Sequence, residues 1–222
     1  MCFSATASLV TAGLTGAAGL VSLGKVNALR EVPLAAVPVF FAAQRGIEGS
    51  LWIALGSDPQ GCVAASLTLG FLLFAEVPWP IYAPVAVWLV EPNATRRKAM
   101  LICIGLGVGV SLYLLWWIVT HSHAAGLADG HIDYVTEARH SGALGVAYLV
   151  ATCLAMLLSS RRTLVLLGVI VLIGSVAALF FYWEAFTEAF TSVWCFFAAA
   201  ASVVIIGHFE YERRPRVRQA SA

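Results

Sequence analysis

The chain has 222 residues, of which 60% are hydrophobic and 11% charged, and its formal net charge is +1. A soluble domain has about 25% charged residues, so these charges are too few to cover a water-soluble fold of this size, and a lipid bilayer must solvate much of the surface. The small net charge excludes a broad basic face for nucleic acid.

Seven apolar stretches predict an all-α, seven-helix transmembrane bundle that forms one domain, residues 1–209, followed by a basic cytoplasmic tail, residues 210–222. The first stretch follows no basic region, so we interpret it as a retained helix and not as a cleaved signal peptide. The seven stretches are residues 5–24, 33–55, 62–91, 99–120, 142–159, 163–183 and 190–208.

The distribution of lysine and arginine predicts the orientation in the membrane. Eleven of them fall in the first, third and fifth loops and the tail, whereas only Arg139 falls on the opposite side and Arg45 lies inside a stretch. Cytoplasmic loops are enriched in these residues, so we expect a multi-pass plasma-membrane protein with its N-terminus outside and its C-terminus in the cytoplasm. The eleven are Lys25, Arg30, Arg96, Arg97, Lys98, Arg161, Arg162, Arg213, Arg214, Arg216 and Arg218.

The third stretch is too long for one upright span, since 30 residues of helix would extend about 45 Å. Pro78, Pro80 and Pro84 interrupt it, and proline breaks the helical hydrogen-bond ladder. We therefore expect a kink or break between Pro78 and Pro84. One interpretation is a bent helix that projects into the cytoplasm, and the other is a broken helix whose freed carbonyls line a cavity.

Polar residues lie deep in the second and third stretches, where burying a charge costs about 2.5–3.5 kcal/mol. Gln44 lies one turn from Glu48 on the same helix face, and Glu76 lies at a similar depth to Gln44. In the structural interpretation, Arg45 pairs with Glu48, and Glu76 is protonated or hydrogen-bonded. In the functional one, Gln44, Glu48, Glu76 and Trp79 line a pocket for a small solute or ion.

The predicted outer loop at residues 121–141 contains four of the five histidines, accompanied by carboxylates. Imidazole and carboxylate groups suit a transition metal such as zinc or copper. A solvated polar loop and a pH-sensing histidine cluster are the alternatives. The histidines are His121, His123, His131 and His140.

The five cysteines show no C-x-x-C spacing, which gives no support to a zinc ribbon or a thioredoxin-like motif. Cys2 is expected at the outer surface as a reactive or metal-ligating thiol. Since Cys62 and Cys195 also fall at outer ends of stretches, a structural disulfide is the competing interpretation.

Gly105 and Gly109 form a G-x-x-x-G motif, which is typical of close helix packing. We favour packing within the monomer over a homo-oligomer formed through this face.

The only lysines, Lys25 and Lys98, fall in cytoplasmic loops, which excludes a retinal Schiff base inside the membrane. The number of spans is similar to that of alkaline-ceramidase-type hydrolases, whose last span carries a His-x-x-x-His zinc pair. The last stretch of this chain has only His208, which argues against that family.

The opening run Met-Cys-Phe-Ser-Ala-Thr-Ala-Ser resembles the start of an uncharacterised family of bacterial membrane proteins. The resemblance extends over most of the chain, although similar sequences often have glutamine where this chain has Arg45. It implies the fold and points to residues, but it names no reaction. The further motifs are Gln44-x-x-x-Glu48-Gly49, Trp52, Glu76, Trp79-Pro80, Pro84 and Ser159-Ser160.

Two functions of different classes follow from these patterns. The first is a membrane protein that binds, transports or senses a small solute or ion in an intramembrane polar pocket. The alternative is an intramembrane metal-dependent enzyme that uses outer histidines as ligands and Glu48 or Glu76 as general base. A purely structural subunit of a larger complex is a third interpretation.

Overall fold

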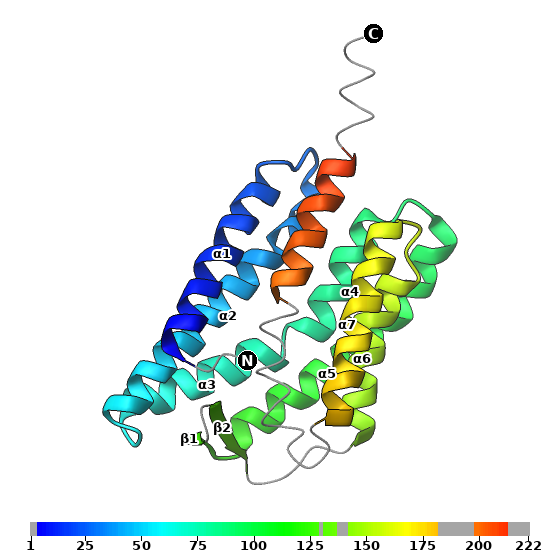
Figure 1. The fold of residues 1–222 in the computed structure, drawn as a ribbon. Helices are drawn as coiled ribbons and strands as arrows, with labels where there is room; N and C mark the ends of the chain where they lie inside the picture. Colours follow the sequence, from blue (N-terminus) through cyan, green and yellow to red (C-terminus); the bar gives the residue numbers. More distant parts are fainter. Residues whose placement is uncertain (1–3, 129–130, 137–141, 182–197, 213–222) are drawn as a thin grey trace.

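The computed structural model describes residues 4–128, 131–136, 142–181 and 198–212, which are mostly helical (Figure 1). The last described segment, residues 198–212, is helical and is called the C-terminal helix below. The other elements are α1 (Ala5–Leu23), the 3-10 turn η1 (Leu29–Glu31), α2 (Val32–Ser57), α3 (Cys62–Glu76), α4 (Trp79–Val90), α5 (Ala94–Thr120), β1 (His123–Ala128), β2 (His131–Thr136), α6 (Gly142–Leu157) and α7 (Arg162–Phe181).

Each of the seven predicted stretches contains helix, but fewer helices satisfy the length and hydropathy of a membrane span. Among the described residues, α1 and α5 do so, and α3 with α4 make a third if the bent pair is counted as one. The apolar part of α6 and α7 is shorter. Helix α2 has 26 residues, but its Gln44, Arg45 and Glu48 lower its hydropathy. Seven spans and the sides of the two termini therefore stay predictions.

The predicted break in the third stretch is confirmed. Helix α3 ends at Glu76, α4 begins at Trp79, and the two axes are bent by 40°. Pro78 and Pro80 lie at the start of α4, where the first backbone N–H groups have no acceptor within the helix, so a proline there loses no hydrogen bond. Pro84 lies inside α4. The hydroxyl of Tyr148 on α6 donates a hydrogen bond to the Ala75 carbonyl beside the break, at 3.3 Å.

Small residues bring helices together, although not the pair that the motif indicates. Gly105 and Gly109 are exposed, and a Cβ at either one would meet no described atom within 4 Å. Packing of this pair within the monomer is therefore wrong for the described residues. Gly107, which lies between them, faces inward and contacts the Pro80 backbone at the start of α4.

The predicted outer loop contains a β-hairpin that packs against the helices (Figure 1). Strands β1 and β2 are antiparallel, with Ala125 opposite Tyr134 and Leu127 opposite Ile132. Ile132 and Tyr134 are buried in a hydrophobic cluster with side chains of α2, α3 and α5. The inward half of the hairpin is thus part of the core and not a solvated loop.

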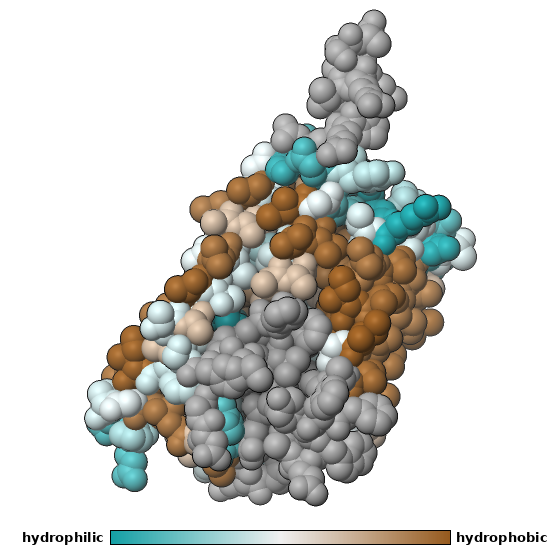
Figure 2. Space-filling view, in the orientation of Figure 1, coloured by the Kyte–Doolittle hydropathy of each residue, from teal (hydrophilic) through white to brown (hydrophobic). Residues whose placement is uncertain are grey.

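A second, larger hydrophobic cluster joins α2, α4, α5, α6, α7 and the C-terminal helix. On the face shown in Figure 2, hydrophobic side chains cover the flanks of the helices, and hydrophilic ones gather toward the ends. This distribution suits a bilayer around the middle of the molecule.

Candidate functional site

Two buried charges on α2 form an ion pair. Arg45 and Glu48 are one helical turn apart, and the Arg45 Nη1 atom lies 2.6 Å from the Glu48 Oε2 atom. Their side chains are 0% and 3% exposed. The ion pair of the structural interpretation is therefore present. Removing two charges from water is expensive even when they are paired, so this position needs further polar partners.

Helix α1 supplies one such partner. Ser8 is fully buried, and its hydroxyl donates a hydrogen bond to the Glu48 Oε2 atom at 3.3 Å. Gly49 allows this approach, because a Cβ at that position would lie 2.7 Å from the Leu9 side chain. The Glu48-Gly49 dipeptide therefore combines the charge with the close helix contact that positions Ser8 beside it.

Strand β2 brings a second polar group to the ion pair. Tyr134 is 5% exposed, and its ring stacks on Phe71 of α3 with a centroid distance of 5.0 Å. Its hydroxyl has no hydrogen-bond partner among the described residues. Burial raises the pKa of Tyr134 well above its usual range, and Glu48 adds to this while Arg45 opposes it. The phenol therefore stays protonated and can donate a hydrogen bond.

We call Ser8, Arg45, Glu48 and Tyr134 the ion-pair site. Sequence reasoning missed Ser8 and Tyr134. The alternation in residues 131–136, which buries Ile132 and Tyr134 and leaves Val135 exposed, is a strand signal that could have identified Tyr134. Ser8 gives no comparable signal, because single serines are common in apolar helices and do not by themselves indicate a site.

The other predicted pocket residues have different neighbours. Gln44 is buried one turn before Glu48 on α2. Trp79 stacks on Phe41 with a centroid distance of 4.7 Å, in an aromatic cluster that includes Tyr82. Glu76 lies beside the α3–α4 break and interacts electrostatically with Tyr148 of α6.

The described histidines do not assemble a metal site. No group of three or more histidine, cysteine, aspartate and glutamate side chains within residues 4–128, 131–136, 142–181 and 198–212 could hold a metal ion. His121 stacks on Trp117 with a centroid distance of 3.6 Å, and the His123 Nε2 atom lies 3.1 Å from the Ile118 carbonyl. His131 pairs with Ala128 in the hairpin. His140 lies outside the described residues.

Of the three cysteines predicted at the outer surface, Cys62 is an exposed free thiol. Cys2 and Cys195 lie outside the described residues, so their predicted roles stay predictions.

A second polar cluster lies at the opposite end of the bundle, around Glu91. The carboxylate accepts hydrogen bonds from the Ser159 hydroxyl at 2.9 Å, and from the Ser160 backbone N–H at 2.8 Å and hydroxyl at 2.5 Å. It also accepts one from the Asn93 backbone N–H at 3.0 Å. Burial alone would raise the pKa of Glu91, but these hydrogen bonds outweigh it and hold the pKa below its ordinary value. They give the Ser159-Ser160 motif a structural role.

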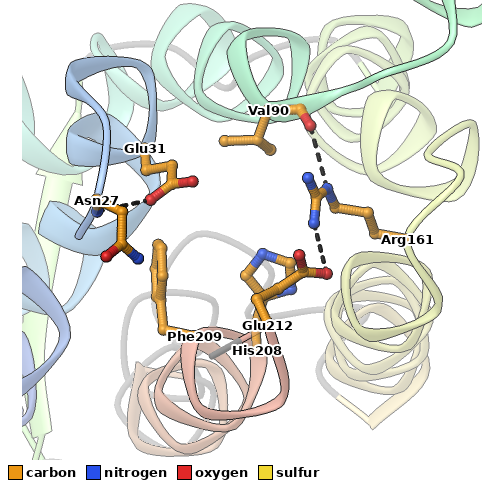
Figure 3. A pocket seen from close by; sticks show the side chains of 7 residues that line it. All are labelled: Asn27, Glu31, Val90, Arg161, His208, Phe209 and Glu212. Atoms are coloured by element: carbon orange, nitrogen blue, oxygen red, sulfur yellow. Dashed lines mark hydrogen bonds and ion pairs between the residues drawn. The ribbon is translucent and has the colours of Figure 1, made fainter. Parts of the chain in front are cut away.

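Segments that are far apart in sequence meet at this end. Arg161 donates to the Val90 carbonyl at 3.1 Å and forms an ion pair with Glu212 of the C-terminal helix at 2.5 Å (Figure 3). Lys25 pairs with Glu210 at 2.6 Å. We call this set the charged end.

The charged end lines a small, partly open cavity of about 10 Å³, which has room for about one water molecule at most. The cavity is too small for an organic solute, so these residues hold the elements together. Its lining residues are Asn27, Glu31, Val90, Arg161, His208, Phe209 and Glu212 (Figure 3).

Replacing Glu91 by glutamine is expected to lower the free energy of unfolding by about 2 kcal/mol, because the amide retains one acceptor oxygen of two and loses the charge. The matched control, E210Q, removes the partly exposed ion pair with Lys25 and should cost at most about 1 kcal/mol. Denaturant titration in mixed micelles measures both.

Because the folded-state pKa of Glu91 is lowered, its stabilisation is present above the unfolded pKa, near 4.5, and is lost as the pH falls below it. The difference between wild type and E91Q should shrink over that range. A difference that is independent of pH would contradict the role of the ionised carboxylate.

Neither the comparison with curated proteins nor that with solved structures finds a match. A family whose members have no known function does match, over residues 1–221. The resemblance to an uncharacterised family is confirmed to that extent. The chain belongs to the family of unknown function DUF6629.

Proposed function

We propose that this chain is an integral membrane protein that binds a small polar solute at the ion-pair site and carries it across the plasma membrane. The observation that carries the proposal is the buried Tyr134 hydroxyl, which lies near the Arg45–Glu48 pair and has no partner among the described residues. Leaving a buried donor unsatisfied costs about 1–3 kcal/mol. A bound solute would supply the missing acceptor.

The surroundings of the site fit this role. The hairpin covers the site from the end that the charge distribution places outside, and the charged end closes the other side of the bundle. Movement of the hairpin would expose the site to one side, and separation of the charged end would expose it to the other. The metal-dependent enzyme gains no support from the described histidines, so we do not propose it.

Tyr134→Phe separates a binding role from a structural one. The hydroxyl makes no described hydrogen bond, so in the absence of a solute we expect Y134F to leave the free energy of unfolding unchanged or to raise it by up to about 1–3 kcal/mol, because an unsatisfied buried donor is removed. A solute that binds the folded state raises the melting temperature. In detergent, a panel of small anionic, cationic and neutral solutes should contain one that stabilises the wild type and stabilises Y134F less.

The control is Y211F, which removes the hydroxyl of a tyrosine that is 67% exposed and should respond like the wild type. If every solute in the panel raises the melting temperatures of Y134F and Y211F equally, the site does not bind a solute through the Tyr134 hydroxyl. If Y134F is strongly destabilised without any solute, the hydroxyl has a structural partner instead.

A further inference from the structure

Basic side chains gather where the start of α5 meets the turn between α6 and α7. The Arg96 Nη1 atom donates hydrogen bonds to the carbonyls of Leu158 at 2.9 Å and Ser159 at 3.1 Å, which hold the two segments together. Lys98 follows two residues later on α5, Arg162 begins α7 three residues after Ser159, and both are exposed. We call Arg96, Arg97, Lys98 and Arg162 the basic rim.

The basic rim has a positive charge that the described carboxylates do not neutralise. Glu91 accepts its hydrogen bonds from the Ser159-Ser160 motif and the Asn93 backbone, and the two glutamates of the C-terminal helix pair with other cations. Within residues 4–128, 131–136, 142–181 and 198–212, no ion pair joins the basic rim to a carboxylate. The Arg97 guanidinium instead lies over the Trp88 ring, 4.3 Å from its centroid. The rim therefore attracts an anionic partner.

An exposed apolar surface continues from the basic rim along the helices. One turn beyond Lys98 on α5, Leu101 and Ile102 are 51% and 76% exposed, and one turn beyond Arg162 on α7, Leu166 is 52% exposed. Residues three and four apart lie on the same helix face, so each of these cations lies at the end of an apolar strip. Figure 2 shows hydrophilic side chains at this corner of the molecule, beside a hydrophobic flank. A phospholipid has the complementary order, with a phosphate group above apolar chains.

We propose that the basic rim binds the phosphate group of an anionic phospholipid, whose acyl chains pack on the exposed apolar residues of α5 and α7. This inference does not depend on solute binding at the ion-pair site. The carbonyl hydrogen bonds of Arg96 fix its guanidinium through Nη1, so its other N–H groups remain to donate to phosphate oxygens. Clusters of lysine and arginine beside a membrane span are typical of sites for anionic lipid. A zwitterionic phospholipid carries its own cation beside the phosphate and gains less from the rim.

Dioleoylphosphatidylglycerol is the probe, added to the full-length protein in detergent at low salt. Dioleoylphosphatidylcholine, which has the same acyl chains and no net charge, is the blank. Native mass spectrometry should show an affinity about tenfold higher for the glycerol lipid, and this preference should shrink as salt screens the exposed charges. The glycerol lipid should also raise the melting temperature more than the choline lipid does. Equal affinity for the two lipids would overturn the inference without the need for any variant.

Glycerol 3-phosphate distinguishes a lipid from a soluble phosphate. It carries the phosphate group without acyl chains, so at the same concentration it should raise the melting temperature much less than phosphatidylglycerol does. An equal rise would mean that the rim recognises phosphate alone, and the assignment to a lipid would be wrong.

The variant R162Q tests whether the basic rim is the site. It removes one exposed charge and should lower the affinity for phosphatidylglycerol about fivefold, whereas K98Q/R162Q should lose most of the preference over phosphatidylcholine. Both variants retain the carbonyl hydrogen bonds of Arg96, so their melting temperatures without lipid should match that of the wild type. The matched control, R30Q, removes an exposed arginine from η1 and should change the affinity by less than about twofold. Equal losses in R162Q and R30Q would indicate attraction by the overall charge and would contradict a site at the rim, as would a full preference in K98Q/R162Q.

Discussion

Replacing Arg45 by glutamine is expected to lower the free energy of unfolding by about 3–5 kcal/mol. Arg45 is fully buried, and its Nη1 atom lies 2.6 Å from the Glu48 carboxylate. Without the guanidinium, Glu48 keeps the hydrogen bond from Ser8 but loses the charge of Arg45 inside the bundle. The cost comes mainly from the loss of this charge beside a buried carboxylate, and much less from the change in packing.

The double variant R45Q/E48Q isolates that cause. It removes both charges and retains two side chains of similar volume, so it should recover most of the stability that R45Q loses, since neutral replacement of a buried pair is often nearly free. Denaturant titration in mixed micelles compares the two variants with Lys25→Gln. The Lys25 pair lies at the charged end, with its glutamate 49% exposed, and should contribute at most about 1 kcal/mol. If the double variant is no more stable than R45Q, the charge interpretation is wrong.

Much of the helical architecture could be predicted because apolar stretches and prolines act locally. The stretch at 33–55 became α2 (Val32–Ser57) and that at 99–120 became α5 (Ala94–Thr120). The break at Pro78 followed from the missing backbone donor. The i,i+3 ion pair on α2 was also readable from spacing alone, since both partners lie on one helix.

The hydrogen-bond partners that other helices and strands contribute to these sites could not be predicted from the sequence. Ser8 reaches Glu48 across 40 positions of sequence and Ser160 reaches Glu91 across 69, and no periodicity encodes such distances. The hairpin was missed because its histidines and carboxylates suggested a solvated loop, although Ile132 and Tyr134 are buried in the core and Ala125 packs against the same cluster. Depth along a span placed Gln44 and Glu76 at similar levels, but depth leaves the rotation of each helix undetermined, so their meeting stays a prediction. The electrostatic interaction of Glu76 with Tyr148 of α6 has no counterpart in the sequence pattern.

The packing role of Gly107 could not be predicted either, because the G-x-x-x-G motif indicated Gly105 and Gly109 as the packing residues. Gly105 and Gly109 complete the G-x-x-x-G spacing, yet both face outward, whereas Gly107 faces the α3–α4 break. A Cβ at Gly107 would overlap the Pro80 carbonyl group. This carbonyl belongs to the backbone of a helix start that Pro78 and Pro80 hold rigid, so it cannot rotate away as the end of a flexible side chain could.

Gly107→Ala is therefore expected to lower the free energy of unfolding by about 3 kcal/mol, at the upper end of the usual cost of overpacking. Gly105→Ala on the same helix is the matched control. Its Cβ meets no described atom within 4 Å, so it should be neutral or stabilise the protein by up to about 1 kcal/mol through helix propensity. The two variants differ by the same methyl group, and denaturant titration in mixed micelles compares them directly. Equal stability of the two variants would mean that α5 does not pack on the start of α4 through Gly107. A destabilised Gly105→Ala would instead indicate that the exposed glycine face packs against a second copy of the chain.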